Sequence, residues 1–441
     1  MGGAGSFAPW RRRAGRLTEV DRESGAGREE VEAEGNTRRV ENLLVVAGEP
    51  SGDRHAAGLV QALQRTYPDV SWRVCGYGGG ALEAAGVELV DTFGGRAAIG
   101  PQAALGQVGH YWRVFRELLA EVERRGVRTA VLVDFPDFNL RLAKKLKEHG
   151  CRVVYFIAPQ VWAWREGRVK QIRRRVDLML VIFPFEEQYF RRQGVPALYV
   201  GNPTAVRFSS RRRLPPRQDG KQVPLIALLP GSRVQEVRQI LPIELDAARF
   251  LARCRPVRFR IVRAPEIAPE LVADVMRKWW KRRGAADLRV EVVAEPLEVA
   301  LNGATAAVVK SGTATLETML AGVPFAMVYR LGWLSWALLR PLVRRQSFCL
   351  ANLVAGEEIA PEFVQWNARG DRIGRWLDEL LARPEAAARI QARMAAAAER
   401  LGRGDAYGRA AAEVGRLLGI GETVRAEMGS VPEPGRRGNT R

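Results

Sequence analysis

Short apolar runs alternate with amphipathic stretches along most of the chain. The runs have the length and branched aliphatic content of buried strands, and helical spacing follows most of them. They cover residues 42–49, 129–135, 152–159, 178–185, 223–232, 259–264 and 306–322, and the last of them continues into a helical stretch. Strands that alternate with helical stretches of about 10–15 residues are typical of parallel βαβ units. The pattern therefore predicts an α/β fold.

The alternation is interrupted once, by a stretch rich in Pro, Arg and Gly, and it fades at both ends of the chain. We therefore predict two Rossmann-like domains with a cleft between them, and a C-terminal helical segment along the edge of that cleft. The expected parts are a flexible extension (1–40), an N-terminal domain (41–206), a linker (207–222), a C-terminal domain (223–370), C-terminal helices (371–420) and a disordered tail (421–441).

The chain is strongly basic. It has 69 Lys and Arg against 49 Asp and Glu, a net charge of +20 over 441 residues. Such an excess fits nucleic acid, an anionic membrane surface or phosphorylated small substrates, and the charge alone does not choose among them. The sequence has no zinc-ligand spacing, no RNP-like signature and no recognisable reading helix, so we expect no nucleic-acid partner.

The numbers of cysteines and histidines bear on whether the protein is stabilised by disulfides or binds a metal. The chain has four cysteines with no CxxC spacing and three histidines. These counts argue against a disulfide framework and against a metal site, so we predict no metal and a reducing compartment. The sequence also lacks the run of about 18 consecutive apolar residues that a transmembrane helix needs, so we predict no membrane span.

Two turns in the second half of the chain are suited to an anion. In LLPGSRVQEV (228–237) a strand ends before Ser232 and Arg233, where backbone N–H groups can approach an anion and a guanidinium suits a diphosphate. In VVKSGTATLETMLAGVP (308–324) a strand passes into a helix at Ser311, Gly312 and Thr313. The alternative for both is an ordinary strand–helix turn whose hydroxyls cap a helix. Two such turns in one domain favour nucleotide binding.

Glu317 lies one turn into the helix that follows the second of these turns. Its carboxylate could accept hydrogen bonds from ribose hydroxyls. The alternative is a first-turn acid that only stabilises the helix dipole.

In the first half of the chain, polar residues follow strand runs. VDFPDFN (133–139) puts Asp134 at the carboxyl end of a strand, where ligands of open α/β sheets bind, and we assign it as a general base. We assign Asp137 to capping the next helix, with Asn139 as the other capping candidate. AGEPSGD (47–53) is a small-residue loop that a sugar or phosphate can approach closely. GYGGGALEAAG (76–86) lacks a clean GxGxxG pattern, so we expect a turn there.

A further block, APQVWAWREGRVKQIRRRVD (158–177), places Trp162 and Trp164 after a strand and before a basic helix. Its functional interpretation is a wall of the cleft with cations facing an anionic ligand. The alternative is core packing for the tryptophans and a solvated face for the arginines.

Taken together, these blocks resemble the lipid-A-disaccharide synthases, a glycosyltransferase family of lipopolysaccharide assembly. The resemblance runs in family order from about residue 43 to residue 365. The matching segments are AGEPSGD, VDFPDFNLRLAKKLKEHG, APQVWAWREGRVKQIRRRVD, IFPFEEQYF, YVGNP, LLPGSRVQEV, KSGTATLE and NLVAGEEIAPEFVQ.

The resemblance implies a GT-B fold and transfer of 2,3-diacylglucosamine from UDP to the 6-hydroxyl of 2,3-diacylglucosamine 1-phosphate. The product would be β-1,6-linked, with inversion at the donor carbon and release of UDP. The N-terminal domain would take the acceptor and the lipid, and the C-terminal domain the UDP-sugar. The resemblance also implies no tightly held cofactor, acylated substrates drawn from the bilayer and a place at the cytoplasmic face of the inner membrane. It leaves a homodimer open.

The resemblance also implies roles for particular residues. Asp134 matches the essential aspartate of the family and Arg233 its essential arginine, while Glu317 is similar to the acid that holds the nucleotide ribose. The remaining expected substrate contacts are Ser51, Gly52, Asp53, Asn139, Gln160, Trp162, Asn202, Ser232, Ser311, Gly312, Thr313, Asn352, Glu362 and Gln365.

Two positions depart from the family pattern. Asn202 stands where the family usually has a histidine, and Ala103 stands at the place of a glutamate. Asn cannot titrate near neutral pH, and Ala supplies no polar group. These departures motivate an alternative, a divergent paralogue that binds nucleotide sugar with an altered acceptor or weak activity.

Two basic regions suit a lipid surface. Residues 321–350 contain four arginines and no acid, around the apolar segment 331–343 with its two tryptophans, which suits an interfacial helix. The alternative is a buried helix. Residues 111–192 hold 18 Lys and Arg against 10 Asp and Glu, a local charge of +8.

Overall fold

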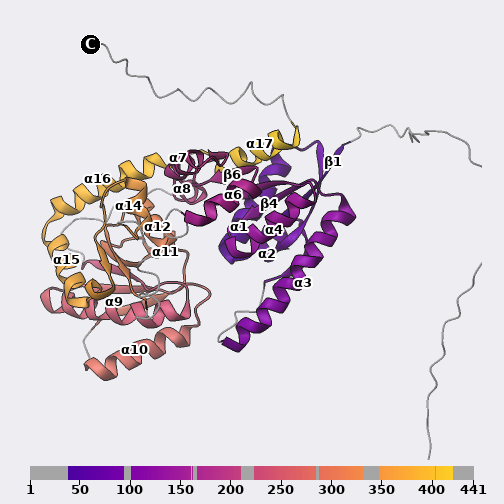
Figure 1. The fold of residues 1–441 in the computed structure, drawn as a ribbon. Coiled ribbons are helices and arrows are strands. Elements are labelled where there is room, and N and C mark those ends of the chain that lie inside the picture. The colour runs from indigo at the N-terminus through magenta and orange to yellow at the C-terminus, as the bar shows by residue number, and fades with distance from the viewer. Residues whose placement is uncertain are drawn as a thin grey trace, which may run out of the picture. The chain divides into compact units, whose positions relative to one another are not determined.

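Two parallel sheets with helices on their faces organise the protein (Figure 1). The computed structural model describes residues 38–93, 101–159, 161, 166–209, 223–284, 288–331, 347–402 and 404–420. The described residues from Arg39 onward lie in one compact unit. The expected extension before residue 38, the tail after residue 420 and most of the expected linker lie outside the described residues, so the domain boundaries stay predictions.

The first sheet has the strand order β3-β2-β1-β4-β5-β6-β7 among the described residues, and all its neighbouring strands are parallel. Its strands are β1 (Arg39–Ala47), β2 (Val70–Gly78), β3 (Glu88–Thr92), β4 (Thr129–Val133), β5 (Arg152–Phe156), β6 (Leu178–Val181) and β7 (Ala197–Tyr199). Its helices are α1 (Pro50–Thr66), α2 (Gly80–Ala84), α3 (Pro101–Arg125), α4 (Pro136–Glu148), α6 (Val169–Arg175) and α7 (Pro184–Arg192), with the short helix η1 (Glu166–Arg168) before α6.

The second sheet has the order β10-β9-β8-β11-β12-β13, again all parallel. Its strands are β8 (Leu225–Leu229), β9 (Arg258–Val262), β10 (Val290–Val293), β11 (Ala306–Lys310), β12 (Phe325–Tyr329) and β13 (Glu362–Val364). The helices that follow β7 along the chain are α8 (Pro203–Ser209), α9 (Val234–Cys254), α10 (Pro269–Arg283), α11 (Leu297–Ala300), α12 (Thr313–Leu320), α14 (Leu350–Ala355), η3 (Gln365–Asn367), α15 (Gly370–Ala382), α16 (Pro384–Arg400) and α17 (Ala406–Leu418).

Both sheets therefore share one strand order, in which the chain starts in the middle, runs to one edge and returns to the other side of its first strand. The side on which the chain adds its next strand changes between β1 and β4 in the first sheet and between β8 and β11 in the second. In doubly wound sheets ligands bind outside the carboxyl ends of the strands at such a reversal. This confirms the expected α/β fold class and marks two strand pairs as the places to look for a site.

The apolar runs form strands because both faces of each sheet are covered, which removes nearly every side chain of a central strand from water. All five residues of β4 are buried, and its successive side chains point to opposite faces. Leu132 joins the core under α3, α4 and α6, whereas Val131 and Val133 join the core under α1. The second sheet is divided in the same way between the core under α9 and the core under α12 and α14.

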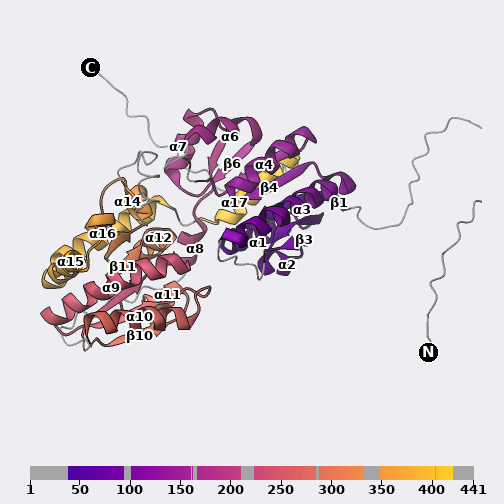
Figure 2. The same cartoon turned by 60° about the horizontal axis from the view of Figure 1, so that its bottom comes forward.

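The last helix returns to the first sheet. Ala410, Ala411 and Val414 of α17 are buried in the same core as α1, and Figures 1 and 2 both show the yellow α17 against the half of the fold that holds α1 and α4. By contrast, α15 packs on α9 and α16 on α14. The expected helices over 371–420 are thus present, but they do not pack together on one part of the fold. The helices α15 and α16 pack beside the second sheet, whereas α17 completes the core of the first.

The glycine-rich segment 76–86 differs from the expected turn. Gly76 and Gly78 belong to β2, and α2 starts only two residues later. A Cβ on Gly76 would come within 1.8 Å of the Val45 carbonyl oxygen, so the glycine is needed for close approach of β2 to β1.

Within the described ranges, none of the helices combines the length and apolar character needed to cross a bilayer.

Candidate active site

A strained turn at the end of β4 carries Asp134. Both Asp134 (φ 46°) and Phe135 (φ 49°) have left-handed backbone conformations, which cost a residue with a side chain about 1–2 kcal/mol each. Asn139 stabilises the turn by donating from Nδ2 to the carbonyl oxygens of Val133 (3.2 Å) and Asp134 (2.8 Å), and the Tyr155 hydroxyl also donates to the Asp134 carbonyl. Asn139 is fully buried. It therefore holds the turn from inside, and this is a different role from the expected substrate contact.

The environment of Asp134 favours its protonated form. Burial raises the pKa of its carboxyl to about 6, and the negative charge of Glu49 adds to the rise. A hydrogen bond from the Phe135 backbone and the positive charge of Arg233 oppose it, and so limit the increase. A carboxylate with a pKa near 6 is ionised at neutral pH and yet basic enough to take a proton from a hydroxyl in a transition state.

The capping role expected for Asp137 is wrong. The N-cap of α4 is Phe135, with no side-chain cap, because the left-handed turn places a different residue at the helix start. The carboxylate of Asp137 instead forms an ion pair with Arg168 of η1.

The loop that follows β1 lies against this turn. Register pairs Ala47 with Val133, so Gly48 and Asp134 leave neighbouring strands side by side. A Cβ on Gly48 would come within 2.2 Å of the Phe135 ring, so only glycine fits there. Ser51 and Gly52 lie in the first turn of α1, Ser51 exposed and Gly52 buried.

Asp53, an expected substrate contact, is hydrogen-bonded inside the protein. It is 4% exposed, and its carboxylate accepts from the backbone N–H groups of Gly79 (2.8 Å), Ala81 (3.0 Å) and Leu82 (3.2 Å). These groups form the start of α2, which otherwise has no side-chain cap. The carboxylate thus occupies the N–H groups that a phosphate would need at the glycine-rich segment.

Replacing Asp53 with alanine should therefore lower the free energy of unfolding by about 1–3 kcal/mol, because buried N–H groups lose their acceptor. Urea unfolding measures this loss, and KM for both substrates should stay within about twofold. An unchanged unfolding midpoint together with a tenfold rise in KM would instead restore the substrate contact expected from the sequence.

Asn202 has a similar internal role. It is 1% exposed, donates to the Ile182 carbonyl (3.1 Å) and accepts from the backbone of Thr204 (2.9 Å) and Ala205 (3.1 Å) at the start of α8. Asn is among the preferred helix N-caps. The departure from the family histidine thus leaves a satisfied helix start.

The first turn of the second sheet follows β8. Gly231 has φ +112°, and a Cβ there would meet Glu236 Oε2 at 2.5 Å. That oxygen accepts from the backbone N–H groups of Ser232 (3.1 Å) and Arg233 (3.3 Å). The N–H groups expected to approach an anion are therefore held by the protein's own carboxylate. The side chains of Ser232 and Arg233 are exposed, so the guanidinium is the cationic group that this turn presents to solvent.

The second turn follows β11, next to β8 in the sheet. Gly312, with φ +152° and ψ −163°, is the N-cap of α12. Because glycine has no side chain, the N-cap residue itself cannot cap the helix. Ser311 donates through its hydroxyl to the Phe348 carbonyl (2.8 Å), so this hydroxyl does not cap the helix. Thr313 is the first residue of α12 and is exposed. The turn therefore exposes Thr313 at the carboxyl edge of the sheet, where ligands of open α/β sheets usually bind.

Glu317 has a protein partner. Arg207 of α8 forms an ion pair with it and lies 3.9 Å from Glu298. Burial raises the pKa of the Glu317 carboxyl, and the charge of Arg207 opposes the rise. The positive charge thus keeps this buried acid closer to its ionised form.

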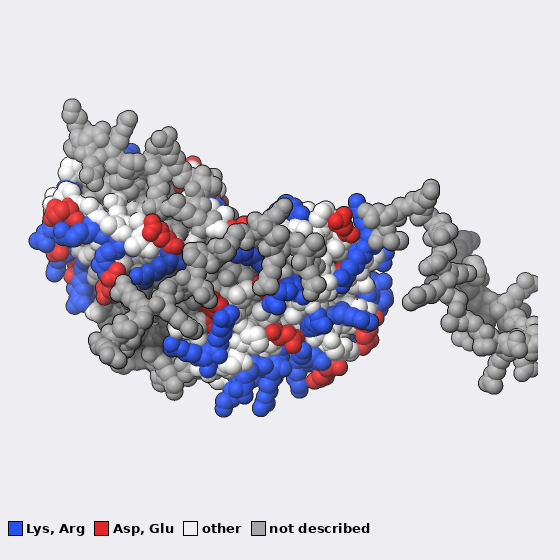
Figure 3. Space-filling model, turned by 90° about the horizontal axis from the view of Figure 1, so that it is seen from above, with Lys and Arg blue, Asp and Glu red and all other residues white. Residues whose placement is uncertain are grey.

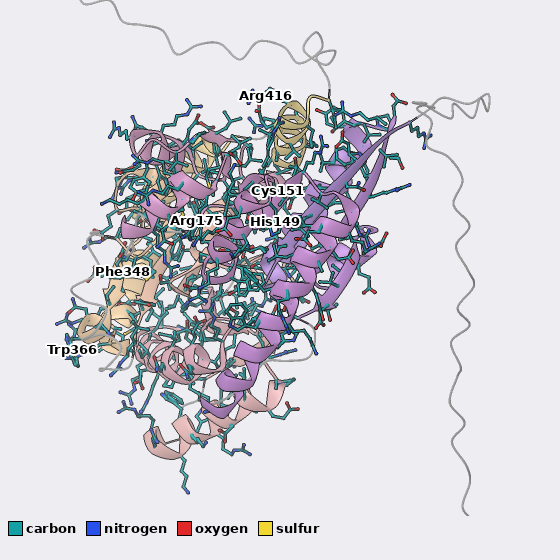
Figure 4. All side chains as sticks on the ribbon, turned by 45° about the vertical axis from the view of Figure 1, so that its right-hand side comes forward. His149, Cys151, Arg175, Phe348, Trp366 and Arg416 are labelled. Carbon is teal, nitrogen blue, oxygen red and sulfur yellow. The ribbon has the colours of Figure 1, made fainter. Side chains whose placement is uncertain are left out.

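The three residues expected at the second nucleotide-side block build its support. Asn352 donates to Ala360 O (2.8 Å) and Glu362 Oε1 (2.9 Å), and its own oxygen accepts from two backbone N–H groups. Glu362 also accepts from Phe348 N (2.8 Å), and Gln365 accepts from Leu331 N (3.1 Å). Figure 4 labels Phe348 and Trp366 in this part of the fold, where Phe348 is half-buried and Trp366 is 76% exposed.

This network positions the segment that Ser311 touches. Gln160 and Trp162, like Trp164, lie outside the described residues. Sequence reasoning missed Glu49, Glu236, Arg207 and Lys310, although Glu236 follows Arg233 at the spacing of a capping box and could have been found by it.

Two Rossmann-type sheets, each with a polar turn at its strand-order reversal, define a GT-B type of α/β protein. Solved structures with this fold include S. aureus MnaA with UDP (TM-score 0.59, 12% identity, 88% of this chain and 100% of that chain). MurG from Acinetobacter baumannii is a second (TM-score 0.52, 14% identity, 86% of this chain and 99% of that chain). At these identities the likeness shows the fold alone.

Sequence comparison is more specific. The profile of the lipid-A-disaccharide synthetase family matches residues 43–412. The lipid-A-disaccharide synthase of Myxococcus xanthus is 39% identical over 340 residues, 75% of this chain and 85% of its own. That of Geobacter sulfurreducens is 35% identical over 391 residues, 86% of this chain and 97% of its own. The chain belongs to the lipid-A-disaccharide synthetase family, which confirms the resemblance read from its motifs.

Proposed function

We propose that this protein joins two acylated glucosamines. It is a glycosyltransferase that transfers 2,3-diacylglucosamine from UDP to the 6-hydroxyl of 2,3-diacylglucosamine 1-phosphate, with inversion. Membership of the lipid-A-disaccharide synthetase family favours synthesis of the lipid A disaccharide over the alternative, a divergent paralogue. The observation that carries the mechanism is the placement of two groups after strands at the two strand-order reversals: Asp134 follows β4 and Arg233 lies in the turn after β8. Burial raises the pKa of Asp134 to about 6, and the positive charge of Arg233 acts on it. The base, Asp134, and the cation for the leaving group, Arg233, are thus close enough to interact electrostatically.

The chemistry follows from this pair. Asp134 takes the proton of the acceptor 6-hydroxyl as the new bond from that oxygen to the donor anomeric carbon forms. The bond from this carbon to the phosphate oxygen breaks, and its electron pair leaves with UDP. Arg233 stabilises the negative charge that develops on the diphosphate. No metal or redox group is required to balance the step.

UDP release by the purified full chain tests the proposal. We expect release only when both the UDP-sugar and the sugar 1-phosphate are present. Release that is independent of the acceptor, or binding of the UDP-sugar with no release at all, would favour the paralogue alternative. Growth of cells that lack their own synthase, after supply of this gene, gives an independent readout.

We further propose that the enzyme works against an anionic membrane surface. Lys170, Arg173 and Arg174 are exposed on α6, and in the part of the chain that the structure describes none of them is ion-paired. Figure 3 shows groups of Lys and Arg side chains on this face, with acidic side chains beside them. Segment 331–343, expected to be interfacial, lies almost wholly outside the described residues.

Reversing the charge of all three α6 residues, Lys170→Glu, Arg173→Glu and Arg174→Glu, should weaken binding to anionic vesicles roughly a hundredfold or more, at about 1 kcal/mol per basic residue. Co-sedimentation at low salt measures this. The matched control reverses Arg372, Arg375 and Arg389, which are exposed on α15 and α16. Equal loss in both triple variants, or no loss in the first, would contradict docking through α6.

A further inference from the structure

A lysine joins the two anion-suited turns of the second sheet. Lys310 is the last residue of β11, which lies between β8 and β12. Its Nζ is 2.7 Å from Glu236 Oε1, and the two side chains are only 20% and 18% exposed. Because Glu236 belongs to the first turn of α9, this ion pair connects the end of β11 with the turn that follows β8.

The other oxygen of Glu236 is engaged with the first turn. Oε2 accepts from Ser232 N and Arg233 N, so the carboxylate stands directly behind the residue expected to bind the leaving group. An uncompensated carboxylate at this place would repel a diphosphate. Lys310 cancels that charge at hydrogen-bond distance.

Lys310 also lies over the second turn. Its Nζ is 3.8 Å from the position that a Cβ on Gly312 would occupy. The ammonium is thus located between the PGSR turn and the start of α12, and it carries three N–H donors, of which Glu236 takes one.

We propose that Lys310 is a second cation for the diphosphate of the nucleotide, beside Arg233. The inference rests on the proposed function, since it assumes that a nucleoside diphosphate binds at these turns. Lys310 neutralises Glu236 and directs its remaining N–H groups to the phosphate oxygens. Arg233 supplies a planar fork from the exposed side, and Lys310 supplies a point charge from the sheet side.

Calorimetric binding of UDP and of uridine to the full chain separates a phosphate contact from general damage. Lys310→Met should weaken UDP binding roughly tenfold to a hundredfold, as expected for loss of a charge-assisted hydrogen bond, and change uridine binding less than about twofold. Lys310→Arg, which keeps the charge, should stay within about threefold of wild type for both ligands. Equal weakening of UDP and uridine, or no weakening of UDP, would overturn the role of Lys310.

A double variant separates contact from neutralisation. Lys310→Met leaves Glu236 without its cation, whereas Lys310→Met with Glu236→Gln removes both charges and keeps an acceptor for the two N–H groups. UDP binding should remain weak in the double variant, and full recovery would overturn the phosphate contact. Wild-type protein that binds no UDP would overturn the proposed function itself, which is a different result from a wild type that binds UDP and a variant that binds it equally well.

Discussion

Replacing Asp134 with asparagine should lower kcat by about 10²–10⁴-fold, the range expected for loss of a general base. Asparagine has the same shape and cannot take the proton. It is also one of the few residues that tolerates the left-handed conformation found at Asp134, so the turn and the fold should persist. UDP release under saturating substrates measures the effect, and a melting temperature near that of wild type excludes unfolding.

Asp137→Asn is the matched control. Asp137 is three residues away in the same segment, and its carboxylate is ion-paired with Arg168 at the surface. We expect nearly wild-type turnover from this variant. Substantial turnover by Asp134→Asn, or an equal loss in both variants, would remove Asp134 from the base role.

The pH dependence of the wild type follows from the same residue. The pKa of Asp134 is raised to about 6, chiefly by burial. A base must be deprotonated to act, so kcat/KM should fall as the pH drops through about 6 and level off above it. This acid limb should be missing from the residual activity of Asp134→Asn.

Replacing Arg233 with alanine should lower kcat by about 10²–10³-fold, because the charge that develops on the departing UDP loses a preorganised donor. UDP affinity should fall as well. The backbone N–H of Arg233 stays bonded to Glu236 in this variant, so the turn itself should survive. Steady-state kinetics together with UDP binding measure both effects.

Two variants sharpen this test. Arg233→Lys keeps the charge and loses the planar fork, so it should recover only part of the activity. Arg238→Ala removes an exposed arginine one turn along α9 and should leave kcat unchanged. If Arg238→Ala were as damaging as Arg233→Ala, the effect would come from net charge and the assignment of Arg233 would fail.

Much of the fold was predictable because buried parallel strands are nearly continuous apolar runs. The central strands β4, β5 and β8 fall within the expected runs, and β1 begins three residues before its expected run. Among the strands not predicted, β10 and β13 are short edge strands and β2 contains glycine, whereas β12 is a buried apolar strand that the expected runs left out. Half-exposed strands lack the continuous apolar signal, and glycine in β2 looked like a turn. Here the packing of neighbouring strands overrode local preference.

The sequence predicted where the main residues of the candidate site lie, but it did not predict which side chains interact with them. Asp134 and Arg233 stand at the strand ends where the sequence put them. Their neighbours depend on strand order, which no local pattern reveals: Glu49 reaches Asp134 because β1 lies beside β4, and Lys310 reaches Glu236 because β11 lies beside β8. Asp53 and Asn352, both expected substrate contacts, have hydrogen-bond partners inside the protein that the sequence did not reveal. Most buried polar side chains have such partners.

The central claim is that this chain makes a disaccharide from two acylated glucosamines. Its most direct test is NMR of the product formed by purified protein from UDP-2,3-diacylglucosamine and 2,3-diacylglucosamine 1-phosphate. We expect one equivalent of UDP and a β-1,6-linked disaccharide 1-phosphate. Free diacylglucosamine in place of the disaccharide, an α linkage, or no product from protein that binds both substrates would contradict the account.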